Sequence, residues 1–344
     1  MKHRKYLLYS IISLFLTVGI VGFTHKANRN SYHLAFYNLE NLFDTLHTPN
    51  KQDYEYLPSS QKKWGTERYS KKIHNIARVI ASINEWQGPD IIGLCEVENK
   101  AVLHDLINKT YLKQLGYEIV HHDGPDQRGI DVALLYKKDR VTPIDVIFHP
   151  VDVAGRPTRE VLHFVAKLKN DTLHYLVNHW SSRFDGTIAT MSKRAIAGRM
   201  VRKIIDSVRT NTPEALFIIT GDFNDNPEDL SIVKALKVGY DQQADLYNTS
   251  YYLFHDLRLG THKYQDKWNL FDQMIISKSL VDNDRLSYKK GSSRIYSPEW
   301  LQVEDTRFNG KRPFRTFIGR RYMGGYSDHF AVYLTLTSSS KKRD

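Results

Sequence analysis

The stretch Phe217-Ile-Ile-Thr-Gly-Asp-Phe-Asn224 joins a run of apolar residues to a group of polar ones. A short apolar run rich in β-branched and aromatic residues is typical of a strand buried in a sheet. Asp222 and Asn224 come at the point where that strand would end. Gly, Asp and Asn also favour turns, so one stretch of this kind is explained equally well as an ordinary turn.

The same arrangement recurs along the chain. The apolar runs that we expect to form strands are His33–Tyr37, Ile91–Cys95, Val132–Tyr136, Val161–Leu168, Leu173–Val177, Leu216–Thr220, Gln273–Ile276 and Phe330–Leu336. Apolar residues recur at helical spacing from Ile73 to Ile83 and from Met191 to Val208. Strands interleaved with a few helices predict an α/β fold built from stacked layers.

Polar residues mark the ends of six of these predicted strands. They are Asn38, Glu96, Asn178-His179, the pair Asp222 and Asn224, Asp272, and Asp328-His329. Buried strands with polar residues at their ends place those residues on one rim of the fold, which is where sheet proteins usually carry their sites.

The residue types at this rim predict a chemistry. Carboxylate and amide oxygens suit a hard cation such as Mg²⁺, or Mn²⁺. Cys95 is the only cysteine, so neither an intramolecular disulfide nor a cysteine-based zinc site can form. Hydrolysis of a phosphodiester needs an activated water and neutralisation of charge on the phosphoryl oxygens. A metal together with a histidine–carboxylate pair supplies both.

The net charge of the chain and its N-terminal sequence indicate a class of binding partner and a cellular location. The formal net charge is +11, which suits a polyanion such as nucleic acid or anionic lipid, or serves solubility alone. A basic start, Met1–Lys5, precedes 18 residues without charge, Tyr6–Phe23. This pattern predicts a signal peptide or an N-terminal membrane anchor, and hence a secreted, periplasmic or membrane-anchored protein whose catalytic domain lies outside the cytoplasm. We expect this segment plus linker over residues 1–30, one domain over 31–337 and a polar tail over 338–344.

The ordered set Tyr37-Asn38, Glu96, Asn178-His179, Gly221–Asn224, Asp272 and Ser327–His329 resembles the endonuclease/exonuclease/phosphatase superfamily. That group includes DNase I, abasic-site endonucleases, inositol-polyphosphate 5-phosphatases and neutral sphingomyelinases. The resemblance extends from about Tyr32 to Leu336. It implies a four-layer αββα sandwich (DNase I-like), with a hydrolytic site at one rim.

The resemblance also implies a role for each matching residue. Asn38, Glu96 and Asp328 would bind the metal. His329 would be the catalytic histidine, oriented by Asp272. Asp222 would orient or activate the water, and Asn224 would hold the phosphate or a metal-bound oxygen. His179 would be the phosphate-binding or acid histidine. Arg159 would contact substrate phosphate.

Two of the assignments have open alternatives. Arg159 is equally well explained as a surface arginine beside Glu160. Asp131 is either a carboxylate that partners His179 or a structural residue at the start of a strand.

The substrate is less closely defined. Three segments, Glu96–Asn99, Gly129–Tyr136 and Val177–Ser182, are similar to bacterial extracellular nucleases, although Glu98 stands where DNase I-like enzymes carry a basic residue. Basic and aromatic residues are interleaved from Ser277 to Tyr322, which suits a nucleic-acid strand, a solvated basic loop or an anionic membrane. We therefore expect a monomeric, exported endonuclease on DNA or RNA. The alternatives are a phosphoesterase acting on phospholipid or inositol-phosphate head groups, and a catalytically silent binding module.

Overall fold

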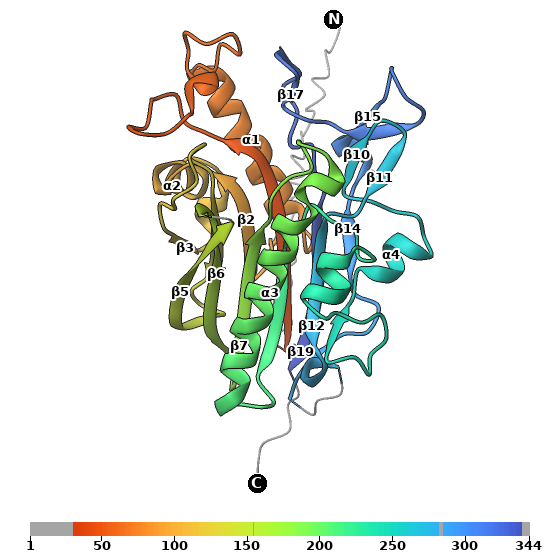
Figure 1. The fold of residues 1–344 in the computed structure, drawn as a ribbon. Helices are drawn as coiled ribbons and strands as arrows, with labels where there is room; N and C mark the ends of the chain where they lie inside the picture. Colours follow the sequence, from red (N-terminus) through yellow and green to blue (C-terminus); the bar gives the residue numbers. More distant parts are fainter. Residues whose placement is uncertain (1–29, 154, 282–284, 339–344) are drawn as a thin grey trace, which may run out of the picture.

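The computed structural model describes residues 30–153, 155–281 and 285–338 (Figure 1). The expected signal peptide or anchor and the polar tail fall outside these ranges, apart from Asn30 and Ser338. None of the helices within the described residues is both long and apolar enough to cross a bilayer.

Two large sheets form the centre of the molecule. The first has the strand order β13 (Leu286–Tyr288), β19 (Ala331–Ser338), β1 (Ser31–Leu42), β2 (Ile91–Val97), β4 (Asp131–Lys137) and β3 (Tyr117–His121), and β14 (Arg294–Tyr296) also pairs with β19. The second has the order β5 (Thr142–Val153), β6 (Arg156–Leu168), β7 (Asp171–His179), β8 (Leu216–Asp222), β12 (Asp272–Ser277) and β9 (Leu246–Asn248).

Smaller elements complete the described chain. Three two-stranded sheets pair β10 (His262–Tyr264) with β11 (Lys267–Asn269), β15 (Gln302–Glu304) with β16 (Lys311–Pro313), and β17 (Phe317–Ile318) with β18 (Arg321–Tyr322). The α-helices are α1 (Thr66–Ser82), α2 (Lys100–Asn108), α3 (Thr187–Asn211) and α4 (Tyr251–His255). Short helical turns are η1 (Tyr54–Tyr56), η2 (Tyr111–Leu115), η3 (Ser231–Ala235), η4 (Lys278–Leu280) and η5 (Glu299–Leu301).

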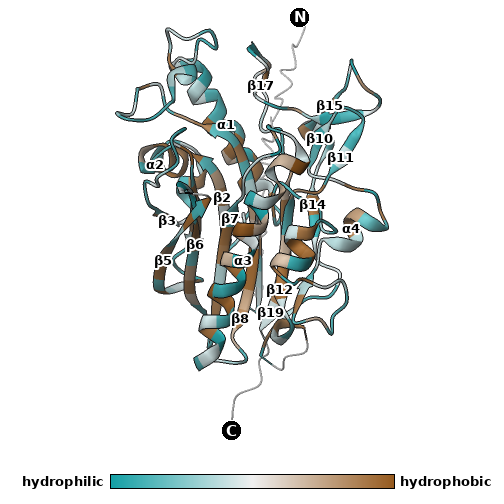
Figure 2. Cartoon of the chain, viewed as in Figure 1, coloured by the Kyte–Doolittle hydropathy of each residue, from teal (hydrophilic) through white to brown (hydrophobic). Residues whose placement is uncertain are grey.

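Three apolar clusters stack these elements into four layers. The middle cluster joins the facing sides of the two sheets, for example Phe36 of β1 and Phe164 of β6. The second packs α1 and α2 on the outer side of the first sheet, and the third packs α3 on the outer side of the second. Figure 2 shows hydrophobic residues concentrated in the strands, while the loops at the ends of the molecule are mostly hydrophilic. The expected αββα sandwich is confirmed.

The eight predicted strands all form, and both predicted helices are found as α1 and α3. Strand β5 was not predicted. It lies at the edge of its sheet, contains Pro143 and Pro150, and exposes most of its side chains, so it lacks the buried apolar stripe by which a strand is recognised. Helix α2, with its short apolar stripe, was also missed.

Strand register brings the polar residues of the rim together. In the second sheet β8 lies between β7 and β12, so that Asp222 is paired with both His179 and Asp272. In the first sheet Asn38 is paired with Cys95, the residue before Glu96. These pairings follow from the apolar runs, because the side-chain alternation of a buried strand fixes its register.

Candidate active site

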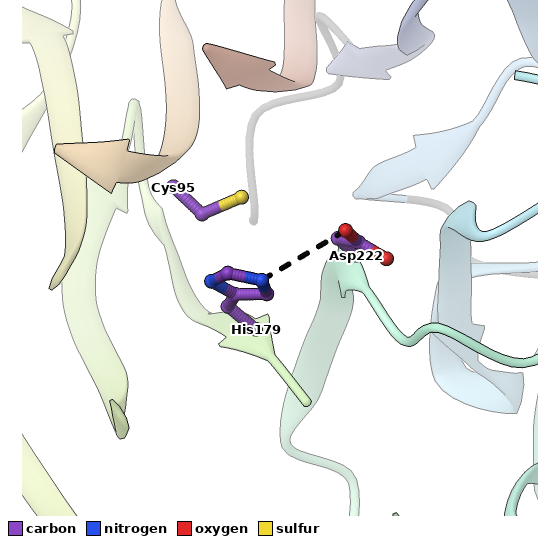
Figure 3. Close-up of side chains that lie close together, drawn as sticks. All are labelled: Cys95, His179 and Asp222. Carbon is purple, nitrogen blue, oxygen red and sulfur yellow. Dashed lines mark ion pairs between the residues drawn. The ribbon is translucent and has the colours of Figure 1, made fainter. Parts of the chain in front are cut away.

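One carboxylate oxygen, Oδ2 of Asp222, lies at the centre of the rim. The side-chain amide of Asn38 donates a hydrogen bond to it over 3.0 Å. Nε2 of His179 and Nε2 of His329 each lie 3.9 Å from the same oxygen. Figure 3 shows the His179 ring facing Asp222. All four residues are buried, so the two sheets together enclose a polar centre with one carboxylate between two imidazoles.

His329 is held in place by Asp272. Nδ1 of the imidazole lies 2.7 Å from Oδ2 of Asp272, which is fully buried. Burial on its own would lower the pKa of His329, but the carboxylates of Asp272 and Asp222 raise it well above the usual range. A carboxylate at Nδ1 fixes the ring orientation and leaves Nε2 for the reacting groups. The expected pairing of Asp272 with His329 is present.

His179 has a different environment. Burial, followed by the nearby charges of Arg159, Arg128 and His329, lowers its pKa well below the usual value, so its ring is neutral at pH 7. Its Nε2 lies 3.8 Å from Oε1 of Glu96. Its Nδ1 is buried and has no hydrogen-bond partner among the described residues.

The expected partnership between Asp131 and His179 is not found. Oδ1 of Asp131 accepts a hydrogen bond from the backbone amide of Gly124 over 3.1 Å, and its Oδ2 lies 3.4 Å from Nε2 of His121. Asp131 begins β4 opposite Val97, and from that position its carboxylate turns toward the end of the neighbouring strand β3. The structural interpretation of Asp131 therefore fits the contacts better.

The Gly221–Asn224 segment is held by backbone contacts. A Cβ atom on Gly221 would lie 2.2 Å from the carbonyl oxygen of Asn178, so only glycine allows β7 and β8 to approach here. The amide of Asn224 donates to Oδ1 of Asp222 over 2.9 Å, and its side chain donates to the carbonyl of Trp180 over 3.1 Å. Burial, partly offset by His329, raises the pKa of Asp222 to about 7.

Glu96, the penultimate residue of β2, has an unusual backbone conformation, with φ of +60°. Non-glycine residues at positive φ are uncommon and cluster at functional sites. Oε2 of Glu96 accepts a hydrogen bond from the amide of Asn41 over 2.9 Å, and Oε1 faces His179. The turn thus presents one carboxylate oxygen of Glu96 to the polar centre.

Asp328 has a partner that the sequence did not reveal. Nη2 of Arg315 lies 2.7 Å from Oδ2 of Asp328, and Nε of Arg315 lies 3.5 Å from Oε1 of Glu40. Although burial acts in the opposite direction, Arg315 lowers the pKa of Asp328. Glu40 is buried, accepts backbone hydrogen bonds from Thr316 and Phe317, and lies 3.9 Å from Nζ of Lys72.

Sequence reasoning missed Glu40, Lys72 and Arg315 as neighbours of the site. Of these three residues, only Glu40 has a signal in the sequence. It lies two residues beyond Asn38 and continues the polar end of β1. Arg315 was counted only among the basic residues of the Ser277–Tyr322 region. Lys72 lies on the buried side of α1, where the apolar spacing gave no sign of a charge.

The comparisons with known proteins agree with this geometry. Residues 33–338 match the Endonuclease/Exonuclease/phosphatase family. The chain belongs to that family. Members of this family are hydrolases that act on phosphoester bonds. The family resemblance that the ordered motifs indicated is confirmed.

Solved structures of this family have the same fold at low sequence identity. TDP2 of D. rerio, humanized by 14 mutations, is 16% identical with a TM-score of 0.58, covering 90% of this chain and 100% of the other. The human Nocturnin catalytic domain is 15% identical with a TM-score of 0.54, covering 90% and 96%. A mannosyl-6-phosphatase of Bacteroides thetaiotaomicron is also 15% identical, with a TM-score of 0.54, covering 89% and 99%. No curated protein matches the sequence.

This family member carries groups of side chains that could hold a divalent ion. Three sets at the rim bring their ligand atoms within 4.8 Å of one another: Asp222 with Asp272 and His329, His262 with Asp328 and His329, and Cys95 with His179 and Asp222. The Cys95 thiol suits a hard cation poorly because such ions prefer oxygen ligands, and burial with the nearby carboxylates raises its pKa (Figure 3).

The predicted metal ligands fit a hard cation to different degrees. Glu96 presents a carboxylate oxygen, and Asn38 an amide oxygen that also accepts from the backbone of Glu40 over 2.9 Å. Oxygen donors of this kind suit Mg²⁺. Asp328 already has its charge balanced by Arg315. Glu96 and Asn38 are therefore the better candidates, with Asp328 as a supporting carboxylate.

Arg159 lies beside the site, where its two terminal nitrogens are hydrogen-bonded and its buried Nε has no hydrogen-bond partner among the described residues. Its guanidinium donates to Asp126 over 3.0 Å, to Thr158 over 2.9 Å and to the carbonyl of Trp180 over 2.7 Å, and the side chain is buried. It is therefore not an exposed arginine. In this arrangement Arg159 secures the loop that follows His179. A contact between Arg159 and substrate phosphate stays a prediction.

The aromatic residues of the Ser277–Tyr322 region are largely used inside the protein. The ring of Trp300 packs against Tyr326 and the guanidinium of Arg78, and Phe317 packs against Trp64. Tyr322 lies under the guanidinium of Arg68. These contacts close one side of the site and leave fewer free rings for a nucleic-acid base than the sequence suggested.

Proposed function

We propose that this protein is a Mg²⁺-dependent phosphodiesterase that cleaves nucleic acid as an endonuclease outside the cytoplasm. The observation that supports hydrolysis most directly is the position of Oδ2 of Asp222, 3.9 Å from Nε2 of both His179 and His329. One buried carboxylate between two imidazoles can orient a water and pass its proton.

The roles of the individual groups follow from their contacts. Asp222 orients the attacking water and accepts its proton. His179, neutral because of burial, can donate a hydrogen bond from its one N–H group to a phosphoryl oxygen. His329, fixed by Asp272 at Nδ1, directs Nε2 at the same region. When bound by Glu96 and Asn38, Mg²⁺ would supply positive charge for the phosphoryl oxygens.

Nucleic acid is favoured as substrate by charge and by precedent for the fold. The chain carries a net charge of +11, which attracts a phosphate backbone. D. rerio TDP2, 16% identical with a TM-score of 0.55, has been solved with a single strand DNA product. A protein with this fold can therefore bind a nucleic-acid strand. The basic start and uncharged stretch of residues 1–23 support export.

The test is turnover of competing substrates by the purified full-length protein. Circular plasmid DNA, RNA and sphingomyelin vesicles are each incubated with Mg²⁺ and, in parallel, with EDTA. We expect nicking and linearisation of the plasmid, or cleavage of the RNA, with Mg²⁺ only. Turnover of sphingomyelin or of an inositol phosphate with intact nucleic acid would favour the head-group alternative. No turnover of any substrate would favour a binding module.

A further inference from the structure

A groove of about 1180 Å³ lies beside the candidate active site. Its walls are the loop before β4, the first residues of β6, the loop after β7 and the start of α3; they include Pro125–Arg128, Arg156–Arg159, Ser181-Ser182 and Thr190. A small enclosed cavity next to it is lined by His179 and Trp180 and shares Arg159 and Ser181 with the groove. The groove and the cavity therefore both adjoin the loop that directly follows His179.

The groove has an excess of positive charge. Arg128, Arg156, Arg159 and Lys193 line it, against Asp126 and Asp185. Asp126 pairs with Arg159 over 3.0 Å, and Asp185 lies 3.6 Å from Nζ of Lys193. Arg128 and Arg156 are exposed. Nε of Arg128 lies 3.6 Å from Oδ1 of Asp126, whereas Arg156 has no ion pair among the residues that the structure describes. The guanidinium of Arg156 is free to contact a phosphate, and Arg128 can exchange its exposed ion pair for one with a phosphate.

An uncovered aromatic ring lies on the same groove. Phe184 is 95% exposed and lines it, and Ile188, four residues later at the start of α3, is 86% exposed. Single exposed apolar side chains are ordinary on protein surfaces. This ring, however, shares a groove with the exposed guanidinium groups of Arg128 and Arg156, and the cavity next to the groove is lined by His179. Such a combination is how proteins bind a single strand, with cations on the backbone and a ring under a base.

We propose that the groove binds a single-stranded segment of the nucleic-acid substrate next to the scissile phosphate. Phe184 stacks on a base, and Arg156 and Arg128 contact phosphates. The inference rests on the proposed function. A single strand is the occupant, rather than a duplex, because a base has a free face for Phe184 only when it is unstacked.

The test is binding of fluorescein-labelled 12-nucleotide DNA and RNA strands to the full-length protein in EDTA, followed by anisotropy. Phe184→Ala is expected to weaken binding roughly tenfold, and Phe184→Trp to preserve it. Arg156→Gln should raise the Kd and lower the salt dependence by about 0.7 in log–log slope. Trp86→Ala is the matched aromatic control. Trp86 is 58% exposed and lies in the loop before β2, whose other end carries Glu96. Lys113→Gln, at an exposed position in η2 outside the groove, is the basic control. Both should bind like the wild type.

The outcomes separate this inference from the proposed function. If the wild type cleaves nucleic acid with Mg²⁺ while Phe184→Ala retains both its affinity and its KM, the groove is not the strand-binding site. If the wild type cleaves no nucleic acid and binds no labelled strand, both proposals are wrong. If Phe184→Ala loses binding to anionic phosphatidylglycerol vesicles but keeps its affinity for the strands, the exposed ring serves a membrane and the inference is overturned.

Discussion

Nδ1 of His329 lies 2.7 Å from Oδ2 of Asp272, although the two residues are 57 positions apart in the chain. Asp272 begins β12 of the second sheet, whereas His329 lies just before β19 of the first sheet. The contact therefore joins the two sheets at the catalytic rim, and it orients the His329 ring so that Nε2 faces Asp222.

Replacing Asp272 with asparagine should test this orientation. Asparagine keeps the size of the side chain but cannot stabilise a protonated ring, and its amide can hold the wrong tautomer. We expect kcat on a phosphodiester substrate to fall by roughly 100-fold or more, with little change in KM. Unchanged kcat would show that Asp272 does not act through His329. Asp241→Asn, at an exposed turn, is the control.

Removing Arg315 should destabilise the fold at the site. Arg315→Met removes the guanidinium that lies against the carboxylates of both Asp328 and Glu40. Because the arginine side chain is one-third exposed, we expect a loss of about 2 kcal/mol in the free energy of unfolding, below the range for a fully buried pair. Urea unfolding measures it, with Arg294→Met as control. A change below about 0.5 kcal/mol would contradict the assigned role.

Gly221→Ala should be far more damaging than a glycine change elsewhere. The added Cβ would lie 2.2 Å from the carbonyl oxygen of Asn178, on a strand that cannot move without disturbing the sheet. We expect at least about 3 kcal/mol of destabilisation, or failure to fold. At Gly65 a Cβ meets nothing within 4 Å, so Gly65→Ala is the matched control. Equal thermal stability of the two variants would contradict the close approach of β7 and β8.

The three neighbouring histidines of the second sheet should make stability fall in mild acid. Nε2 of His163 lies 2.9 Å from Nδ1 of His174, and Nδ1 of His163 lies 3.3 Å from Nε2 of His149. Burial, with the neighbouring histidines, lowers the pKa of His163 to about 3. The unfolded chain binds this proton near pH 6.5 and the folded chain only near pH 3. Stability is therefore fully present above pH 6.5 and decreases as the pH falls toward 3.

Urea unfolding at pH 7 and pH 5 checks this effect. The wild type should lose more stability between these pH values than His163→Gln does, by about 2 kcal/mol. The difference between the two proteins isolates His163 from the other titrating groups. An equal loss in both proteins would mean that His163 takes up its proton in the folded state, contrary to its burial.

The apolar runs predicted a layered α/β fold and most of the rim, because both depend on buried strands, while the αββα sandwich was implied by the resemblance to the family. The apolar runs fixed β1, β2, β7, β8 and β12, and their register brings Asn38, His179, Asp222 and Asp272 together. What the sequence could not show is which long side chain reaches which carboxylate. Arg315 comes from a loop with no apolar periodicity, and Asp131 lies on a predicted strand but turns toward His121. Such contacts depend on rotamers and loop paths rather than on pattern.

The most direct test of the central claim is cleavage of a fluorophore–quencher oligonucleotide by the wild type and by His329→Ala in Mg²⁺, each repeated with EDTA. We predict that the wild type cleaves the oligonucleotide only in Mg²⁺. The cleavage rate of the variant, still folded by circular dichroism, should be lower by roughly 100-fold or more. Cleavage by His329→Ala at the rate of the wild type, or wild-type cleavage that persists in EDTA, would contradict it.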